Sequence, residues 1–274
     1  MDNYRPQGFS LLPTIVKNLL IINGLFFLMT IVIQNTFQKD LTDWLALYYP
    51  GAPEFKAYQF ATHLFMHGNF MHLFSNMFAL WMFGSALENI WGPKKFLTYY
   101  IITGLGAAVL HTLVIYVEIS SLQSAANQFF ADPTNKSFEY FVLNSVPQQY
   151  QPIFVELMNS WNSNPASIEL QQNAIGFANE LIQVKQSIPT VGASGAVFGV
   201  LLAFGMMFPN SMIYVFFFLP MKAKYFVLLY GIFELYSGIQ NNPSDNVAHF
   251  AHLGGMLFGF ILIKYWRKKT NRWY

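Results

Sequence analysis

The 274-residue sequence contains no cysteine, and only 10% of its residues are charged, against about 25% in an ordinary soluble domain. A chain without cysteine has no disulfide framework, no thiol nucleophile and no Cys-ligated metal. So few charged residues could not cover the surface of a soluble domain of this length. The net charge of +2 is too small and too widely spread to favour nucleic-acid binding. The expected surrounding of this chain is therefore a lipid bilayer.

Apolar residues dominate instead: 54% of the sequence is hydrophobic and 18% is aromatic. A helix that crosses a bilayer needs about 20 mostly apolar residues. We therefore expect an all-α membrane protein in which residues 1–274 form one membrane domain. A short apolar stretch, 212–219, precedes Pro220 and predicts an interfacial or re-entrant segment. Six longer stretches predict transmembrane helices, at about 14–34, 60–87, 96–117, 189–208, 223–239 and 247–266.

The basic residues predict which way the chain crosses, because Lys and Arg concentrate on the cytoplasmic side. With the N-terminus inside, only Lys39, Lys56, Lys136 and Lys185 face outward. The first apolar stretch lacks a signal-peptide cleavage pattern, so we expect it to be a retained span. Both termini are expected in the cytoplasm, in an integral protein of the cell's inner or plasma membrane. The eleven basic residues on the cytoplasmic side are Arg5, Lys17, Lys94, Lys95, Lys222, Lys224, Lys264, Arg267, Lys268, Lys269 and Arg272.

Residues 118–188, between the third and fourth spans, differ in kind from the rest. They are rich in Asn, Gln and Ser and contain six acidic residues. By the orientation above they form a polar, helical insert on the outer face. Two apolar stripes at helical spacing predict amphipathic helices in it. These are Leu170, Ala174, Phe177, Leu181 and Val184, and the shorter set Ile153, Leu157 and Trp161.

Polar residues inside membrane spans are costly and usually functional. The second span contains His72 and Asn76, which are four residues apart and share a helix face, together with His63 and His67. The fourth span opens with Gly192-Ala-Ser-Gly195, and the sixth contains His249 and His252. A serine, histidines and an amide on three spans are typical of hydrolysis rather than of a transport path.

Each of these groups has a chemical purpose. A serine hydroxyl becomes a good nucleophile when a base takes its proton. A buried histidine is favoured in the neutral form that a base needs. The tetrahedral intermediate needs hydrogen-bond donors for its oxyanion, and His72, Asn76 and the backbone N–H of Ser194 could supply them. Helix packing is the simpler interpretation of each residue taken alone. Their combination favours chemistry.

Glycine pairs at four-residue spacing predict where the spans approach closely. Gly195 and Gly199 form one pair, and Gly255 and Gly259 form the other. Small residues at this spacing let two membrane helices pack tightly. We expect Ser194 and His252 to face each other across the contact between spans four and six.

The motifs His72-Leu-Phe-Ser-Asn76, Gly192-Ala-Ser-Gly195 and Ala251-His252-Leu-Gly-Gly255 resemble, in order and spacing, those of rhomboid intramembrane proteases. The resemblance covers all six expected spans. It implies a serine endopeptidase with Ser194 as nucleophile, His252 as base, and His72 and Asn76 in the oxyanion site. It also implies that Glu88 is a structural brace on the cytoplasmic side, and that His63 and His67 help to hold the second span and the first loop.

The resemblance has departures. No Trp-Arg pair occurs in the first outer loop, and the insert before Ser194 is long. Phe198 stands where some relatives have a Tyr stacked on the catalytic histidine, and Phe can stack there too. Substrates would be transmembrane segments of other membrane proteins, and we expect no cofactor, no metal and no nucleic-acid partner. No acidic residue is evident as a third member beside Ser194 and His252, since Glu88 lies at the wrong end of its span. The sequence identifies no partner for Glu234 or for His111.

Several alternatives remain open. His249 lies three residues before His252 and could be the base instead. The chain could be a catalytically inactive rhomboid-like protein that binds membrane clients, although such proteins typically lose the serine or the histidine. A transporter would show inverted repeats and paired charges in the membrane, and neither is seen. All five aspartates, Asp2, Asp40, Asp43, Asp132 and Asp245, lie outside the expected spans, and no His-Glu-x-x-His zinc motif occurs, which excludes the aspartyl and zinc routes of intramembrane proteolysis.

Overall fold

The structure is a computed structural model that describes residues 10–215, 218–240 and 247–270. Arg5, Arg272, Asp2 and Asp245 of the sequence argument lie outside these residues. Helices make up most of the described chain, in two compact units. The first unit contains residues 1–47, 56–111 and 189–274, and the second contains 48–55 and 112–188. All of the polar motifs singled out above belong to the first unit.

The first unit contains α1 (Thr14–Phe37), α2 (Thr42–Leu45), α3 (Gln59–Thr62), η1 (His63–Phe65), α4 (Phe70–Ala79), η2 (Leu80–Gly84), α5 (Ser85–Trp91), most of the apolar part of α6 (Pro93–Ala131), α10 (Ser194–Met207), β1 (Met212–Val215), β2 (Leu219–Lys222), α11 (Ala223–Gln240) and α12 (His249–Thr270).

Three of these stretches are long and apolar enough to cross a membrane: Thr14–Phe37, Phe70–Trp91 and Pro93–Ala131. They support an integral membrane protein. By contrast, α10 has 14 residues and so extends only about 21 Å, less than the roughly 30 Å of a hydrocarbon core. Over their described residues, α10, α11 and α12 do not reach the length and hydropathy of the three helices above. The arrangement of six spans therefore stays a prediction.

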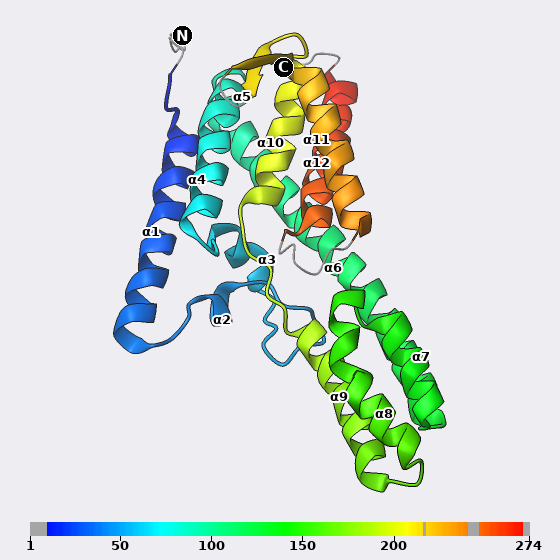
Figure 1. Ribbon diagram of the computed structural model, residues 1–274. Coiled ribbons are helices and arrows are strands. Elements are labelled where there is room, and N and C mark those ends of the chain that lie inside the picture. Colours follow the sequence, from blue (N-terminus) through cyan, green and yellow to red (C-terminus); the bar gives the residue numbers. More distant parts are fainter. Residues whose placement is uncertain (1–9, 216–217, 241–246, 271–274) are drawn as a thin grey trace, which may run out of the picture. The chain divides into compact units, whose positions relative to one another are not determined.

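The centre of the first unit is α10, which is apolar all round and buried along most of its length. A helix without a polar face is stable only when other elements surround it. Here α4, η2, α5, α11 and α12 all pack against it (Figure 1). The most extensive of these contacts is the one with α12. Ser194, the first residue of α10, is thus placed at the end of the most enclosed helix of the unit.

The expected second span, 60–87, is not one continuous helix. The chain leaves helical conformation after η1, and α4 begins at Phe70, where the side chain of Asn69 accepts a hydrogen bond from the His72 N–H at 2.8 Å. Asparagine is a favoured N-cap because its side chain satisfies an unpaired backbone donor of the first turn. His63 and His67 therefore precede the helix that carries His72. Between α4 and α5, η2 is a π-helical turn.

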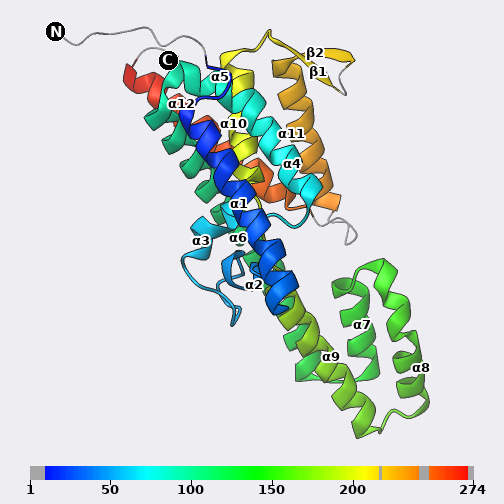
Figure 2. The same ribbon diagram turned by 90° about the vertical axis from the view of Figure 1, so that its left-hand side faces the viewer.

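Within the stretch 212–219, residues Met212–Val215 form the strand β1 and Leu219 begins β2, and the expected interfacial position stays a prediction. β1 pairs antiparallel with β2, with Tyr214 opposite Pro220 (Figure 2). Ile213, Tyr214 and Val215 are residue types that favour strands. In a two-stranded sheet both strands are edges, and edge strands are where proline is tolerated in a sheet. The all-α expectation is therefore wrong at this hairpin.

The second unit has a hydrophobic core of its own. It contains the last part of α6 with α7 (Asn135–Ser145), η3 (Gln148–Phe154), α8 (Val155–Ser163) and α9 (Ile168–Gln186). Of the two predicted stripes, Ala174 and Trp161 are fully buried, whereas Val184 and Ile153 are exposed. The apolar face of α9 instead includes Ala178 and Ile182. The buried residues of the second unit's core are Ala126, Phe129, Phe138, Phe141, Val142, Val146, Trp161, Ala174, Ala178 and Ile182.

Candidate active site

Ser194 is presented by a short extended segment that leads into α10. Thr190 exchanges two backbone hydrogen bonds with Leu47, at 2.8 and 2.9 Å, and the N–H of Gly192 donates to the carbonyl of His63 at 2.9 Å. Gly192 has a φ of 127°, which a residue with a side chain rarely adopts. The helix expected from residue 189 therefore begins only at Ser194. As the first helical residue, Ser194 lies among backbone N–H groups that have no partner within the helix.

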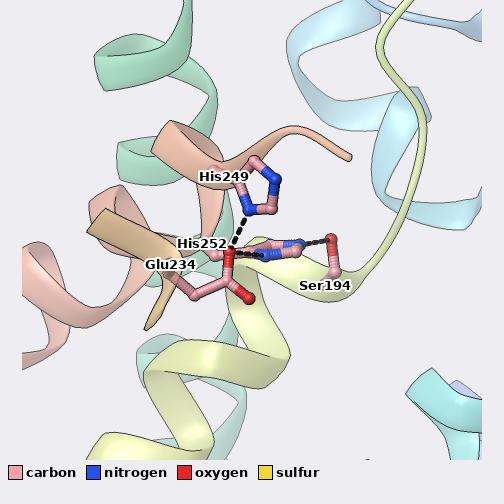
Figure 3. Close-up of polar contacts among 4 residues, drawn as sticks. All are labelled: Ser194, Glu234, His249 and His252. Atoms are coloured by element: carbon pink, nitrogen blue, oxygen red, sulfur yellow. Dashed lines mark hydrogen bonds and ion pairs between the residues drawn. The ribbon is translucent and has the colours of Figure 1, made fainter. Parts of the chain in front are cut away.

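His252 of α12 meets this serine. The Nε2 atom of His252 lies 2.9 Å from the Oγ atom of Ser194 (Figure 3). Ser194 is partly exposed, whereas His252 is buried. The distance is that of a hydrogen bond between a hydroxyl and a neutral imidazole. The structure thus brings together the serine and the histidine that the sequence analysis paired.

The close approach of α10 and α12 makes this contact possible. A β-carbon on Gly255 would collide with the backbone carbonyl of Gly195, so these two glycines lie at the helix contact. Gly199 and Gly259 are different, because their nearest atoms belong to Thr103 and Tyr99 of α6. The glycine pairs therefore allow three helices, α6, α10 and α12, to approach one another closely. Gly195 also lies against the side chain of Ala107 on α6.

Phe198 stacks on the ring of His252. The ring centroids are 4.1 Å apart and the planes differ by 5°. Phe198 lies one helical turn after Ser194, so its side chain occupies the same face of α10. The expected stacking is confirmed, and it fixes the plane in which the imidazole lies.

The other ring nitrogen of His252 contacts a carboxylate that the sequence analysis set aside. Oε2 of Glu234, in α11, lies 2.9 Å from Nδ1 of His252 and 2.6 Å from Nδ1 of His249 (Figure 3). The expectations that Glu234 has no specific partner, and that no acidic group accompanies the pair, are wrong. One signal in the sequence indicated this, since a carboxylate inside an apolar helix is costly unless it is paired. Its partner could not be read from the sequence.

His249 is placed beside the site rather than in it. Its Nδ1 bonds to Glu234, and the hydrogen bond made by the Ser194 hydroxyl goes to His252. The two histidines lie on the first turn of α12, with ring centroids 6.4 Å apart. Between the two candidate bases, this geometry favours His252.

The expected oxyanion donors lie on α4. The position where Gly192 would carry a β-carbon is 2.8 Å from Nε2 of His72 and 3.4 Å from Oγ of Ser194. A side chain at residue 192 would fill the space between nucleophile and donor. Asn76 is buried one turn further along, and its Nδ2 donates to the carbonyl of His72 at 3.1 Å. Within the described structure Asn76 makes no hydrogen bond to Ser194, whereas Nε2 of His72 and Oγ of Ser194 both border the space beside Gly192.

His63 and His67 lie in the chain just before α4. Nδ1 of His63 lies 2.9 Å from the carbonyl of Gln59, and His67 packs edge-on against His72 with centroids 5.1 Å apart. Neither ring nitrogen of His67 has a hydrogen-bond partner among the described residues. His111 also has a partner that the sequence did not identify, because its Nε2 lies 3.1 Å from Oγ1 of Thr190.

Glu88 lies away from these groups, in α5. Its two carboxylate oxygens accept the N–H groups of Ile15 and Val16, both at 2.8 Å. These donors belong to the first turn of α1, which has no side-chain cap of its own. A carboxylate at a helix N-terminus also interacts favourably with the helix dipole. This contact joins α1 to α5.

Glu234, His249 and His252 also form a group that could hold a metal ion, with ligand atoms within 4.8 Å of one another. Imidazole nitrogens and carboxylate oxygens are ligands that zinc accepts. A metal bound through both Nδ1 atoms would need their lone pairs free and would therefore replace the hydrogen bonds to Glu234. The expectation of no metal stays a prediction.

The chain is similar to proteins of one family. The family described as "Rhomboid domain" matches residues 54–121 and 167–269, which leaves out 122–166. An uncharacterized mitochondrial rhomboid protein of Schizosaccharomyces pombe is 29% identical over 215 residues, or 76% of this chain. Rhomboid protease AarA of Providencia stuartii is 33% identical over 32% of the chain, and rhomboid protease GlpG of Klebsiella pneumoniae is 31% identical over 27%.

These relatives are matched over part of their own length. The match covers 51% of the Schizosaccharomyces pombe protein and 27% of each of the two bacterial proteases. The chain thus spans about half the length, or less, of these relatives. The residues left unmatched by the family, 122–166, fall within the second unit.

Proposed function

The chain belongs to the rhomboid family, and on this premise we propose that it is an intramembrane serine protease. Its substrates are peptide bonds in or near the transmembrane segments of other membrane proteins. The observation that carries the proposal is the 2.9 Å contact between Oγ of Ser194 and Nε2 of His252. These two side chains come from the first turns of two helices that pack closely, and a hydroxyl with an adjacent base is the arrangement of an activated nucleophile.

The reaction follows from this contact. His252 takes the proton of Ser194 through Nε2 as Oγ attacks the carbonyl carbon of the substrate. The tetrahedral intermediate collapses when the protonated imidazole gives its proton to the leaving amine, which breaks the peptide bond and leaves an acyl-serine. His252 then takes a proton from water as the water attacks the acyl group, and it returns this proton to Oγ of Ser194 as the second product leaves as a carboxylic acid. No cofactor or metal takes part in these steps.

The developing oxyanion is stabilised from two directions. The backbone N–H of Ser194 and the start of α10 supply donors and a favourable helix dipole. The ring of His72 supplies a donor across the space that Gly192 leaves open. Asn76 completes the set when its amide turns from the carbonyl of His72, the partner that it has in the structure without substrate. A position about 3 Å from nucleophile and donors is what a reacting carbonyl needs.

We propose six transmembrane helices for the membrane domain, with both termini in the cytoplasm of an inner or plasma membrane. Three helices long and apolar enough to span, and the excess of basic residues on one side, support this arrangement. Residues 118–188 are proposed as an insert on the outer face. Their separate hydrophobic core and the absence of 122–166 from the family match support an insert.

Labelling with a fluorophosphonate tests the proposal. The purified wild-type protein should label and should cleave a model transmembrane substrate, whereas Ser194→Ala should do neither. Ser85→Ala is a matched control, because Ser85 is also a helical serine of the first unit, but its buried hydroxyl makes no hydrogen bond in the described structure. A folded wild-type protein that neither labels nor cleaves any substrate would contradict the proposal and favour a role in binding membrane clients.

A further inference from the structure

Glu234 is a charged residue within the long apolar stretch Tyr225–Tyr236 of α11. It is 2% exposed. An ionised carboxylate in such surroundings is strongly unfavourable unless donors surround it. α11 packs against both α10 and α12, so a side chain on this helix can reach the site from a third direction. The position of Glu234 therefore requires partners, and the structure identifies two.

Both partners donate to the same oxygen. Oε2 of Glu234 lies 2.9 Å from Nδ1 of His252 and 2.6 Å from Nδ1 of His249 (Figure 3). A carboxylate only accepts hydrogen bonds, so each Nδ1 must carry the proton. In a neutral imidazole the protonated nitrogen is then Nδ1, and the lone pair is on Nε2. For His252, this lone pair faces Oγ of Ser194 at 2.9 Å.

From this geometry we propose that Glu234 is a positioning residue for the reaction, so that the site is a Ser194–His252–Glu234 triad. The carboxylate holds His252 in the tautomer that can take a proton from Ser194, and its charge stabilises the imidazolium that forms. The proposal rests on the proposed protease function and names a third member of the same site. Glu234 does not take up the proton itself.

His249 has a supporting part in this arrangement. A buried carboxylate with a single donor would be poorly satisfied, and His249 supplies the second hydrogen bond. It also occupies one side of Oε2, which leaves His252 the other side. Two contacts hold the imidazole of His252 in place. One is the hydrogen bond to Glu234, which joins α12 to α11, and the other is the ring of Phe198 stacked on it.

Replacement of the carboxylate by its neutral isostere tests the proposal. Glu234→Gln should lower kcat by about 10²-fold or more while KM changes little, because the amide cannot stabilise the imidazolium by charge. Glu88→Gln is the matched control, since Glu88 is also a buried carboxylate of the first unit that bonds to a neighbouring helix. It should lower the melting temperature and leave kcat per folded molecule unchanged.

A spectroscopic measurement tests the tautomer without a substrate. In protein labelled with ¹⁵N-histidine, the nitrogen signals of His252, assigned by their loss in His252→Ala, should show a proton on Nδ1 in the wild type. In Glu234→Gln the population of this tautomer should fall. A wild-type His252 with its proton on Nε2 would overturn the proposal, and so would a folded Glu234→Gln protein with wild-type kcat. This measurement on the wild type decides the question even where the variant does not fold.

Three outcomes separate the possible failures. Loss of wild-type activity in EDTA, with recovery on addition of Zn²⁺, would overturn the triad and indicate a metal centre at Glu234, His249 and His252. Cleavage that depends on Ser194 but is equally fast in Glu234→Gln would overturn the triad alone. A wild-type protein without labelling or cleavage would instead contradict the proposed function, whatever the tautomer of His252.

Discussion

Gly255 of α12 lies so close to the backbone carbonyl of Gly195 in α10 that no β-carbon fits between them. Gly195 directly follows Ser194, and Gly255 is three residues from His252. The closest point of the two helices is therefore next to the two reacting side chains, and the distance between the helices sets the distance between Oγ and Nε2.

Gly255→Ala should consequently reduce both activity and stability. The added methyl group forces α10 and α12 apart, and overpacking of this kind typically costs about 1–3 kcal/mol. We expect weaker fluorophosphonate labelling of Ser194 and a lower melting temperature, measured on the same preparation. Gly24→Ala is the control, because Gly24 is in α1 with nothing within 4 Å of its missing β-carbon. An active and stable Gly255→Ala protein would mean that this helix contact does not set the geometry.

The assignment of the base predicts different results for the two histidines of α12. His252→Ala should abolish cleavage of a model transmembrane substrate, as Ser194→Ala should, because both remove one member of the reacting pair. His249→Ala should retain most of the activity, since His249 bonds to Glu234 and not to the serine. Cleavage rates and circular dichroism of the purified variants measure activity and folding. The reverse pattern, with His252→Ala active and His249→Ala inactive, would show that His249 is the base.

The oxyanion assignment predicts an effect on turnover more than on binding. Removal of one oxyanion donor typically lowers kcat by ~10²–10³-fold. His72→Ala and Asn76→Ala should therefore each slow cleavage strongly and change KM less. His72 lies directly beside the site, whereas Asn76 bonds to the carbonyl of His72 within α4, so the larger effect is expected for His72. Wild-type turnover in both variants would return the pair to a purely structural role.

The insert predicts a change in rate or selectivity without loss of the chemistry. Residues 122–186 should be replaceable by a short Gly/Ser linker, because the second unit buries its apolar residues in its own core. Labelling of Ser194 should persist, and cleavage rates across several substrates should shift if the insert acts as a lid, since lid motions often limit turnover. Unchanged kinetics would exclude a lid. Loss of labelling together with loss of folding would show that the insert stabilises the membrane domain.

The sequence predicted those parts of the site that short motifs specify. Ser194, His252 and His72 each lie in a motif of four or five residues, and the structure brings these three together. Glu234 was missed because its partners are on another helix, and the pairing of α11 with α12 is a tertiary contact without a local pattern. A charge inside an apolar segment was the one signal, and it indicates that a partner exists but not which one.

The fold was predicted best where long apolar stretches coincide with uninterrupted helices. α1 and α11 agree with the expected spans to within a few residues. The break before Phe70 was missed because apolar residues flank it on both sides, although Asn69 is a residue type typical of a helix start. The hairpin of β1 and β2 was missed because a run of four residues is too short for its periodicity to be decisive.

The π-helical turn of η2 couples two sites that lie on the same stretch of chain. It separates His72 and Asn76 on α4 from Glu88 on α5. A π turn holds one residue more than an α turn, and each residue of a helix corresponds to a rotation of about 100°. A π turn takes up its extra residue with little change in the face of the helix that follows, so loss of one residue from Leu80–Gly84 would leave a regular α-helix in which His72 and Glu88 keep their faces. A single deletion in this turn should therefore be tolerated, whereas the same deletion within α4 or α5 would turn His72 or Glu88 away from its partners.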